Sequence, residues 1–482
     1  MQLRNLKSYG VAIVLFVAAM LCLTQLCWAQ LSSASFDIVI TNGRIIDGTG
    51  SPWYSGDVGI REGKIAAIGD LSGTTRKRTI DAAGKVVAPG FIDMLGQSET
   101  TILVEPRLPS KIYQGITTEI TGEGGSIAPM NDVLLESDRA GFEHYHLTAD
   151  WKTFRQYFAR LEKQGIGINL ASYVGATQVR RMVLGDDDKQ PTPEQLEQMK
   201  TLVREAMKDG AVGVSSALEY APAPYAKTEE LIALAAEAGK FGGIYATHMR
   251  NESDSVLQSI DEALRIGREA HVPLEIWHIK VAGKKNWGRM PEVVAKINAA
   301  RAAGADVSAD TYAYTAWFND FSAFVPPWVH DGGAAKMVER LKDPAMRKKI
   351  RRDMLTASKD WDNEWQEIPG PQAIMIGVVQ NEKMLPLQGK RLSEIAKLWG
   401  KDPIDALLHF LIDDRTKCNN AAGHGALPRG GSVDDTVYRQ GVPATRAEVL
   451  RTLKHRSEPY HPSPPFHIAV PLCCVRRVPR RG

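Results

Sequence analysis

Two short apolar runs that each end in a histidine constrain the fold of this chain most strongly. One run leads into His248 and the other into His278, and the stretch between the two histidines has helical periodicity. This order predicts a β-α-β unit with one imidazole at the C-terminal end of each strand. The C-terminal ends of parallel barrel strands lie side by side on the face that carries active sites. We therefore expect both rings to point into one cavity.

The two imidazoles are candidate metal ligands. Neutral imidazole is the commonest protein ligand for zinc, and two such groups on adjacent strands supply half of a tetrahedral site. The alternative interpretation is that His248 and His278 are buried residues that are hydrogen-bonded within the mouth of the barrel. Two histidines alone leave both interpretations open.

Composition restricts the other ligands and the partners. The cysteines lie near the two ends of the chain, at Cys22, Cys27, Cys418, Cys473 and Cys474. Any metal bound between residues 31 and 417 must therefore be held by nitrogen and oxygen atoms. The formal net charge of +3 is small for 482 residues. No basic stripe interleaved with aromatic residues occurs, so nucleic acid is not an expected partner.

Residues 1–29 have the pattern of a signal peptide. Arg4 and Lys7 precede an apolar run over residues 11–23, and Ala29 offers a small residue for cleavage. This pattern predicts export to a periplasm or to the extracellular space. The alternative is an uncleaved membrane anchor, although the apolar run is short for a bilayer span. No other contact with a membrane is expected.

The residues after this leader divide into a small β domain and a barrel. Residues 36–87 alternate in polarity and break at Asn42-Gly43 and Glu62-Gly63, which predicts antiparallel hairpins of a small β domain. That this domain is β-sandwich-like is implied by the family resemblance described below. Between residues 88 and 415, apolar runs alternate with helical segments, which predicts an α/β fold with parallel strands. That this fold is a (β/α)8 barrel of the TIM type is implied by the family resemblance described below. The predicted barrel strands are 86–92, 117–121, 168–174, 212–217, 243–247, 274–278 and 306–312. The eighth strand is not recognisable.

Helices are predicted between these strands. The clearest covers residues 192–208, where Thr192 is a plausible N-cap and Pro193 occupies the first turn. Residues 331–381, rich in Lys, Arg, Trp and Pro, are predicted to be an insertion, and residues 391–413 to form two helices.

Several motifs resemble those of one enzyme superfamily. They are Arg44-Ile-Ile-Asp-Gly-Thr-Gly50, Ala88-Pro-Gly-Phe-Ile-Asp93, Gly213-Val-Ser-Ser-Ala-Leu-Glu219, Thr247-His-Met-Arg-Asn-Glu252, His278-Ile-Lys-Val-Ala-Gly283 and Asp310-Thr-Tyr-Ala-Tyr-Thr-Ala316. Together they are similar to the amidohydrolase superfamily and, within it, to the N-acyl-D-amino-acid deacylases (D-aminoacylases). The resemblance implies a (β/α)8 barrel beside a small β-sandwich. It also implies zinc-dependent hydrolysis of a linear amide, from an N-acyl-D-amino acid to a carboxylate and a D-amino acid.

The resemblance further implies which residues hold the metal. In the resembled deacylases a His-x-His pair follows the Gly-Phe-Ile-Asp signature, but this chain has Leu95 and Gln97 there. Leucine cannot bind a metal and an amide oxygen is a poor zinc ligand, so one zinc ion is expected in place of a binuclear centre. Glu123 stands where the family has its bridging ligand, and with His248 and His278 it is expected to hold the ion. The alternative for Glu123 is a solvated loop carboxylate.

Substrate and catalytic residues follow from the same resemblance. Tyr314 matches a family tyrosine that contacts the substrate or the oxyanion. Lys280, two residues after His278 on the same predicted strand, is expected to face the same side and to pair with an anionic substrate. The alternative for both is packing or a buried ion pair. The family takes its general base from an aspartate after strand eight, and the nearby carboxylates, Asp434 and Asp435, follow no recognisable strand.

Residues 416–482 differ in character from the rest of the chain. Residues 417–431 have no hydrophobic period, and residues 457–467 are dominated by proline, which removes the donors that a central strand needs. One interpretation is a disrupted reading frame or a truncated gene product, and the other is a lineage-specific tail.

Three functional hypotheses remain open at this point. The first is hydrolysis of a small-molecule N-acyl-D-amino acid by a zinc enzyme. The second is a dipeptidase or a cyclic-amide hydrolase of the same superfamily. The third is an inactive barrel, which predicts no stoichiometric metal and no turnover of N-acyl-D-amino acids.

Overall fold

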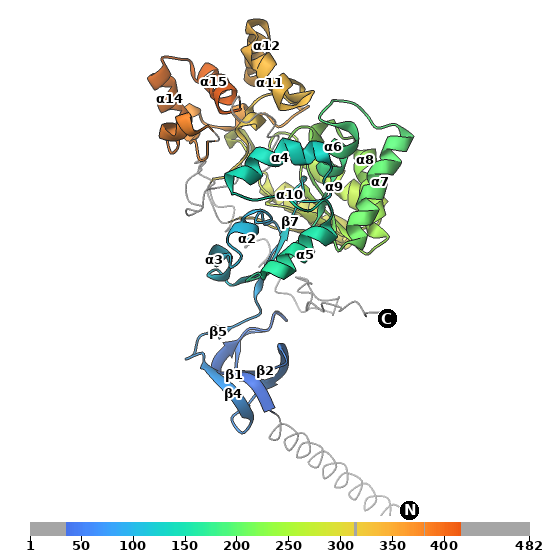
Figure 1. Ribbon diagram of the computed structural model, residues 1–482, viewed down its shortest axis with the longest axis vertical. Helices are drawn as coiled ribbons and strands as arrows, with labels where there is room; N and C mark the ends of the chain where they lie inside the picture. The colour runs from blue at the N-terminus through green and yellow to red at the C-terminus, as the bar shows by residue number, and fades with distance from the viewer. Residues whose placement is uncertain (1–34, 313–315, 380, 416–482) are drawn as a thin grey trace, which may run out of the picture. The chain divides into compact units, whose positions relative to one another are not determined.

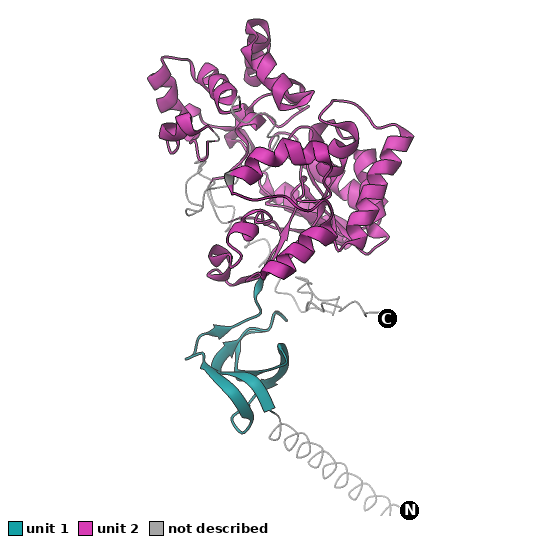
Figure 2. Ribbon diagram, in the orientation of Figure 1, with its two compact units in different colours: residues 1–91, 464–482 teal, residues 92–463 magenta. Residues whose placement is uncertain are grey.

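The computed structural model describes residues 35–312, 316–379 and 381–415. They belong to two compact units, of which the first ends at Phe91 and the second begins at Ile92 (Figure 2). The predicted leader and the predicted tail lie outside the described residues, as do Tyr314, Asp434 and Asp435. No described helix has the length and the apolar character that a bilayer crossing requires.

The first unit is a five-stranded mixed sheet. Its strands are β1 (Ser35–Ile45), β2 (Tyr54–Arg61), β3 (Lys64–Gly69), β4 (Thr75–Asp81) and β5 (Val86–Val87), in the order β3-β2-β1-β4, with β5 paired to β1. The hairpin predicted at Glu62-Gly63 is confirmed, because β2 and β3 pair antiparallel around it. The hairpin predicted at Asn42-Gly43 is wrong. Asn42 adopts a φ of 56° inside β1, where the register shifts as in a bulge and the strand continues.

The second unit contains a parallel barrel sheet. Its strands are β6 (Phe91–Asp93), β7 (Ile116–Thr121), β8 (Asn169–Ser172), β9 (Val174–Gly175), β10 (Gly213–Ala217), β11 (Ile244–His248), β12 (Leu274–Ile276) and β13 (Val307–Ala309). The sheet orders are β6-β7-β8 and β9-β10-β11-β12-β13. Only Tyr173 separates β8 from β9, so each of the seven predicted strand regions contains a barrel strand. The predicted fold class is confirmed.

The first barrel strand is shorter than the predicted range of residues 86–92. Val86–Val87 pairs with Arg44–Ile45 in the first unit, and the barrel strand begins only at Phe91. Pro89 lies between the two segments and has no backbone N–H to give to a sheet. The apolar run over residues 86–92 therefore contributes residues to two different sheets.

Helices follow the barrel strands (Figure 1). They are α2 (Thr101–Val104), α3 (Pro109–Ile112), α4 (Asp132–His144), α5 (Phe154–Gln164), α6 (Ala176–Leu184), α7 (Pro193–Lys208), α8 (Thr228–Gly239), α9 (Val256–Ala270) and α10 (Met290–Ala302). As predicted, α7 starts after Thr192, whose side chain accepts from the backbone N–H of Gln195 in a capping box. Short 3-10 helices are η1 (Ala223–Tyr225), η2 (Lys284–Asn286), η3 (Phe321–Phe324), η4 (Pro327–His330), η5 (Pro371–Ala373) and η6 (Glu382–Leu387).

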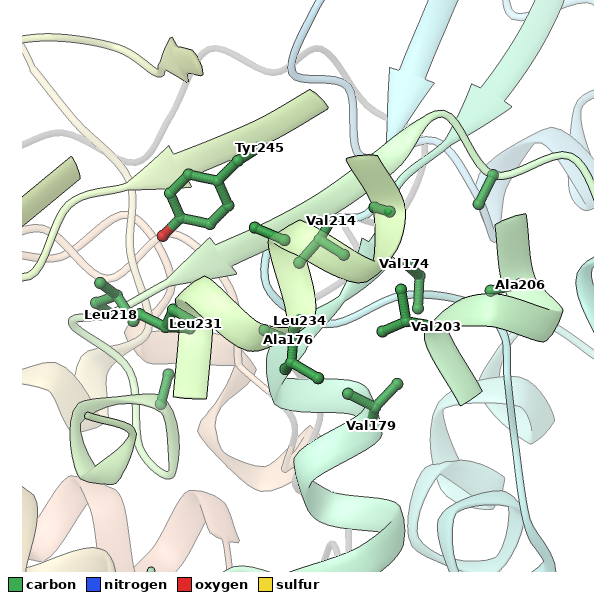
Figure 3. Close-up of a cluster of buried hydrophobic side chains, with 14 of the residues drawn as sticks. Val174, Ala176, Val179, Val203, Ala206, Val214, Leu218, Leu231, Leu234 and Tyr245 are labelled. Carbon is green, nitrogen blue, oxygen red and sulfur yellow. The ribbon is translucent and has the colours of Figure 1, made fainter. Parts of the chain in front are cut away.

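The main core lies between the strands and these helices. Figure 3 shows Val174, Val214 and Tyr245 of the sheet packed against side chains of α6, α7 and α8. A smaller apolar cluster is formed by the opposite face of the strands. It contains Tyr173, Ala246 and Trp277, with Leu95, Ile120, Val212 and Ile244 packed against it.

The last described part of the second unit is helical. Its helices are α11 (Gly333–Lys342), α12 (Pro344–Leu355), α13 (Glu364–Glu367), α14 (Leu392–Trp399) and α15 (Pro403–Arg415). They surround a core of their own, which includes Phe324, Leu341, Ile350 and Leu407. The two helices predicted over residues 391–413 are confirmed as α14 and α15.

One buried ion pair joins two of the barrel helices. The guanidinium of Arg180 on α6 lies 2.6 Å from the carboxylate of Glu230 on α8, and both side chains are almost fully buried. We predict that Glu230→Gln lowers the free energy of unfolding by about 3–5 kcal/mol, because it leaves the Arg180 charge buried without its counter-ion. Urea unfolding followed by circular dichroism measures this.

The matched control is Glu205→Gln. Glu205 pairs with Lys208 at 2.8 Å, but both side chains are exposed. This variant is expected to change the free energy of unfolding by less than about 1 kcal/mol. Equal effects of the two substitutions would contradict the prediction.

Candidate metal centre

Glu123 is carried by a glycine-flanked loop after β7. Gly122 and Gly124 adopt φ values of +96° and +67°, in the left-handed region that favours glycine. A Cβ on Gly122 would lie 2.6 Å from the backbone oxygen of Tyr173, and a Cβ on Gly124 would lie 2.7 Å from Cβ of Ala217. The loop therefore passes against both neighbouring strands, and only glycines fit beside Glu123.

Strand alternation places His248. Ile244 and Ala246 belong to the apolar cluster that includes Trp277, and His248 is the next residue of β11 on the same face. The ring is buried, at 5% exposure of its side chain. The predicted position of His248 at the end of a barrel strand is thus what the structure shows.

A turn, and not strand alternation, places His278. β12 ends at Ile276, two residues before the predicted end of the strand. His278 has a φ of +36°, which is uncommon outside glycine, and its backbone N–H donates to the carboxylate of Asp310. The strained backbone and this hydrogen bond turn the ring toward Glu123.

The three side chains meet at one oxygen atom. Oε1 of Glu123 lies 3.1 Å from Nδ1 of His248 and 3.4 Å from Nε2 of His278. The two rings are nearly perpendicular, with centroids 4.5 Å apart. Oxygen and nitrogen ligands about 2.0–2.1 Å from a tetrahedral ion lie about 3.3 Å from one another. The donor types and their spacing therefore fit an ion such as zinc.

Charge in the cluster favours an ionised Glu123 and a protonated His248. Burial raises the pKa of Glu123, but the hydrogen bonds of His248 and His278 outweigh it and hold this pKa well below its usual range. Burial lowers the pKa of His248, but the charge of Glu252 and the hydrogen bonds to Glu123 and Glu219 raise it to about 10. In the metal-free chain the protonated Nδ1 of His248 thus donates a hydrogen bond to Oε1 of Glu123.

Leu95 and Gln97, which the sequence analysis predicted to stand in place of a His-x-His pair, have other roles in the structure. The Nε2 amide of Gln97 donates to Oε2 of Glu123 at 2.6 Å, so it fixes the carboxylate oxygen that does not face the imidazoles. Leu95 packs into the apolar cluster with Tyr173 and Trp277. Neither side chain contributes a metal-binding nitrogen.

Lys280 reaches the same cluster, although it lies beyond the end of β12. Its Nζ forms an ion pair with Oε2 of Glu252 and lies 3.0 Å from Nδ1 of His278. Burial lowers the pKa of Lys280, but the charge of Glu252 raises it above its usual value, so the ammonium is retained. The prediction that Lys280 follows His278 on one strand is wrong, because the strand has already ended.

Two further carboxylates contact the imidazoles and were missed in the sequence. Oε2 of Glu219 lies 2.8 Å from Nε2 of His248, and Oε1 of Glu252 lies 3.1 Å from Nδ1 of His278. Both glutamates lie just beyond the C-terminal end of a barrel strand, β10 and β11 respectively. That position was the available signal, because barrel sites are built from the loops after strands.

A parallel barrel with nitrogen and oxygen donors converging beside its strand ends is the arrangement of a barrel metal centre. The model of the Amidohydrolase family matches residues 78–424. The chain therefore belongs to this family.

Characterised relatives share part of their length with this chain. It is 39% identical to a D-aminoacylase of Alcaligenes xylosoxydans xylosoxydans over 297 residues, which are 60% of this chain and 59% of the relative. It is 38% identical to an N-acyl-D-glutamate deacylase of the same organism over 278 residues, 58% of this chain and 57% of the relative. The matched region thus spans less than two thirds of each relative.

Solved structures of the same kind are similar in fold. An N-acyl-D-glutamate deacylase from Bordetella bronchiseptica, complexed with zinc and a phosphonate inhibitor, has a TM-score of 0.63 and 30% identity, and the match covers 79% of this chain and 70% of that one. A D-aminoacylase structure has a TM-score of 0.61 and 32% identity, with 78% and 70% covered. A metal ion is therefore expected in a protein of this kind.

We predict that metal affinity depends on pH through His248. At neutral pH a ring with a pKa of about 10 carries both protons, and a metal bound at Nδ1 must displace one of them. Affinity for Zn²⁺ is expected to rise about tenfold per pH unit from about pH 7 to about pH 9. Chelator competition at several pH values measures this. A flat profile would show that His248 is already neutral in the metal-free chain.

Proposed function

We propose that this chain hydrolyses the amide bond of N-acyl-D-amino acids with one zinc ion held by Glu123, His248 and His278. The observation that carries the proposal is the single oxygen of Glu123 within reach of a nitrogen from each of two imidazoles. The deacylase relatives support the choice of a linear N-acyl amino acid as the small-molecule substrate.

The number of ions follows from the replaced residues. Leu95 and Gln97 offer no imidazole for a second ion, and Gln97 is hydrogen-bonded to Glu123. A similar solved D-aminoacylase, 33% identical, is described as having a binuclear centre with one-metal activation and second-metal attenuation. A one-ion centre is therefore compatible with the proposed chemistry.

An ion in this position would act as a Lewis acid, polarising the amide carbonyl and activating water for attack. The chain's own residues hold the site in place around it. Gln97 fixes the second oxygen of Glu123, so this carboxylate presents one oxygen to the imidazole side. Lys280 keeps a positive charge beside the cluster, where the carboxylate of an N-acyl amino acid would need one, although Glu252 shares that charge.

Two assignments stay predictions. Tyr314, proposed to contact the substrate or the oxyanion, lies outside the described residues. We assign no general base among the described residues, and the sequence candidates Asp434 and Asp435 lie outside them. The leader pattern of residues 1–29 supports our proposal that the protein acts outside the cytoplasm.

The proposal predicts stereospecific release of amino acid. Purified chain saturated with Zn²⁺ is expected to hydrolyse N-acetyl-D-amino acids, among them the D-glutamate and D-aspartate derivatives, and to leave the L-enantiomers intact. Chromatography of the released amino acid measures this. An inactive barrel would bind no stoichiometric zinc and turn over none of these compounds.

Glu123→Gln separates the metal centre from the rest of the fold. The amide is a poor zinc ligand, so bound zinc should fall well below one ion per chain and kcat/KM should fall by about two orders of magnitude. The control is Glu143→Gln on α4, whose side chain is 70% exposed. Full zinc content in Glu123→Gln would remove Glu123 from the site.

A further inference from the structure

Glu219 lies on the opposite side of the His248 ring from Glu123. Its Oε2 is 2.8 Å from Nε2, whereas Oε1 of Glu123 is 3.1 Å from Nδ1. The side chains of His248 and Glu219 are 5% and 7% exposed, so water has little access to either. The imidazole is therefore held between two carboxylates, one at each ring nitrogen.

We propose that Glu219 is a positioning residue that keeps a proton on Nε2 of His248, so that Nδ1 is the atom presented to the metal. The inference rests on the metal centre proposed above. Imidazoles that bind metals usually donate their second ring N–H to a carboxylate or a carbonyl, which fixes both the tautomer and the orientation of the ring. The carboxylate of Glu219 has the position and the distance that this arrangement requires.

The distances favour this role over a second cation site. Glu219, His248 and Glu252 also bring donor atoms within 4.8 Å of one another. However, 2.8 Å between Glu219 and His248 is a hydrogen-bond distance and is shorter than the separation of about 3.3 Å between two ligands of one tetrahedral ion. A second ion at Nε2 would also take the last proton of a ring that already binds through Nδ1.

A carboxyl group from the helical part of the second unit lies beside Glu219. Glu364, the first residue of α13, lies against Glu219, and a side-chain amide N–H of Asn319 donates to Oε1 of Glu364. Burial and the charge of Glu219 raise the pKa of Glu364 well above its usual value, which favours the protonated form of Glu364 beside Glu219. A protonated carboxyl group beside Glu219 does not repel the carboxylate that faces Nε2 of His248.

His278 is less suitable for testing whether a carboxylate keeps the second ring nitrogen of a metal-binding imidazole protonated. Its Nδ1 lies 3.1 Å from Glu252 but also 3.0 Å from Nζ of Lys280. A donor and an acceptor thus compete at this nitrogen, whereas Nε2 of His248 has carboxylate oxygens of Glu219 and, at 3.8 Å, Glu252 around it. The experiments below therefore address His248.

The first experiment measures zinc affinity by competition with a chromogenic chelator. Glu219→Gln keeps an oxygen acceptor without the charge, and Glu219→Leu removes both. We expect affinity to fall in the order unmodified chain, Glu219→Gln, Glu219→Leu, by about 10- to 100-fold in total, with saturation still at one ion per chain. Glu119→Gln is the control, because Glu119 on β7 is equally buried but pairs with Lys111 at 3.1 Å.

The outcomes separate this inference from the metal centre itself. Unchanged affinity in both Glu219 variants, with one ion still bound, would overturn the positioning role and leave the centre intact. Loss of a second equivalent of zinc in Glu219→Gln would overturn it in favour of a second cation site. Absence of stoichiometric zinc in the unmodified chain would overturn the proposed centre and this inference together.

The second experiment needs no substitution at Glu219. Ring ¹⁵N chemical shifts of the zinc-loaded, histidine-labelled chain report which nitrogen of each imidazole is protonated, and His248→Gln identifies the resonances of His248. We expect protonated Nε2 and zinc-bound Nδ1 in His248. Zinc at Nε2 would overturn the inference even if every Glu219 variant failed to fold.

Discussion

The hydrogen-bonded contact of one Glu123 oxygen with two imidazoles is the interaction on which the site depends. A buried carboxylate without partners is costly, and here the partners are ring nitrogens that come from two different strand ends. The contact exists only because the loop after β7 passes close to the end of β8 at Gly122 and close to β10 at Gly124. A residue with a side chain at either position would move the carboxylate and separate the three donors.

Around this contact the polar groups form successive layers. The imidazole of His248 contacts Glu219, and that of His278 contacts Glu252. Glu219 in turn contacts Glu364, and Glu252 contacts Lys280. The layers alternate in charge or in proton donation, which is how a group of buried carboxylates avoids mutual repulsion. Below the polar layers, Leu95 and Trp277 belong to the apolar cluster on the inward strand face. Leu95 therefore contributes to packing and offers no ligand to the site.

The parallel α/β class and the place of His248 could be predicted from the sequence, because apolar runs that alternate with helical periods are a local property of the chain. The position of His278 depends on a turn with positive φ and on Asp310, which a local pattern does not contain. The bulge at Asn42 has the same residues as a hairpin turn, and only its pairing partner distinguishes the two. The partners of Glu219 and Lys280 are set by contacts between distant segments, so no spacing in the sequence indicates them.

The helical segment that carries α13 has a consequence for how such proteins diverge. Glu364 comes from a segment that supplies none of the three proposed ligands, yet it touches the carboxylate behind one of them. Insertions outside the strands of a barrel tolerate changes in sequence and length more readily than the strands do. Two relatives with identical ligands but different insertions would therefore hold the same ion with different strength, so metal preference could diverge while the donor atoms stay the same.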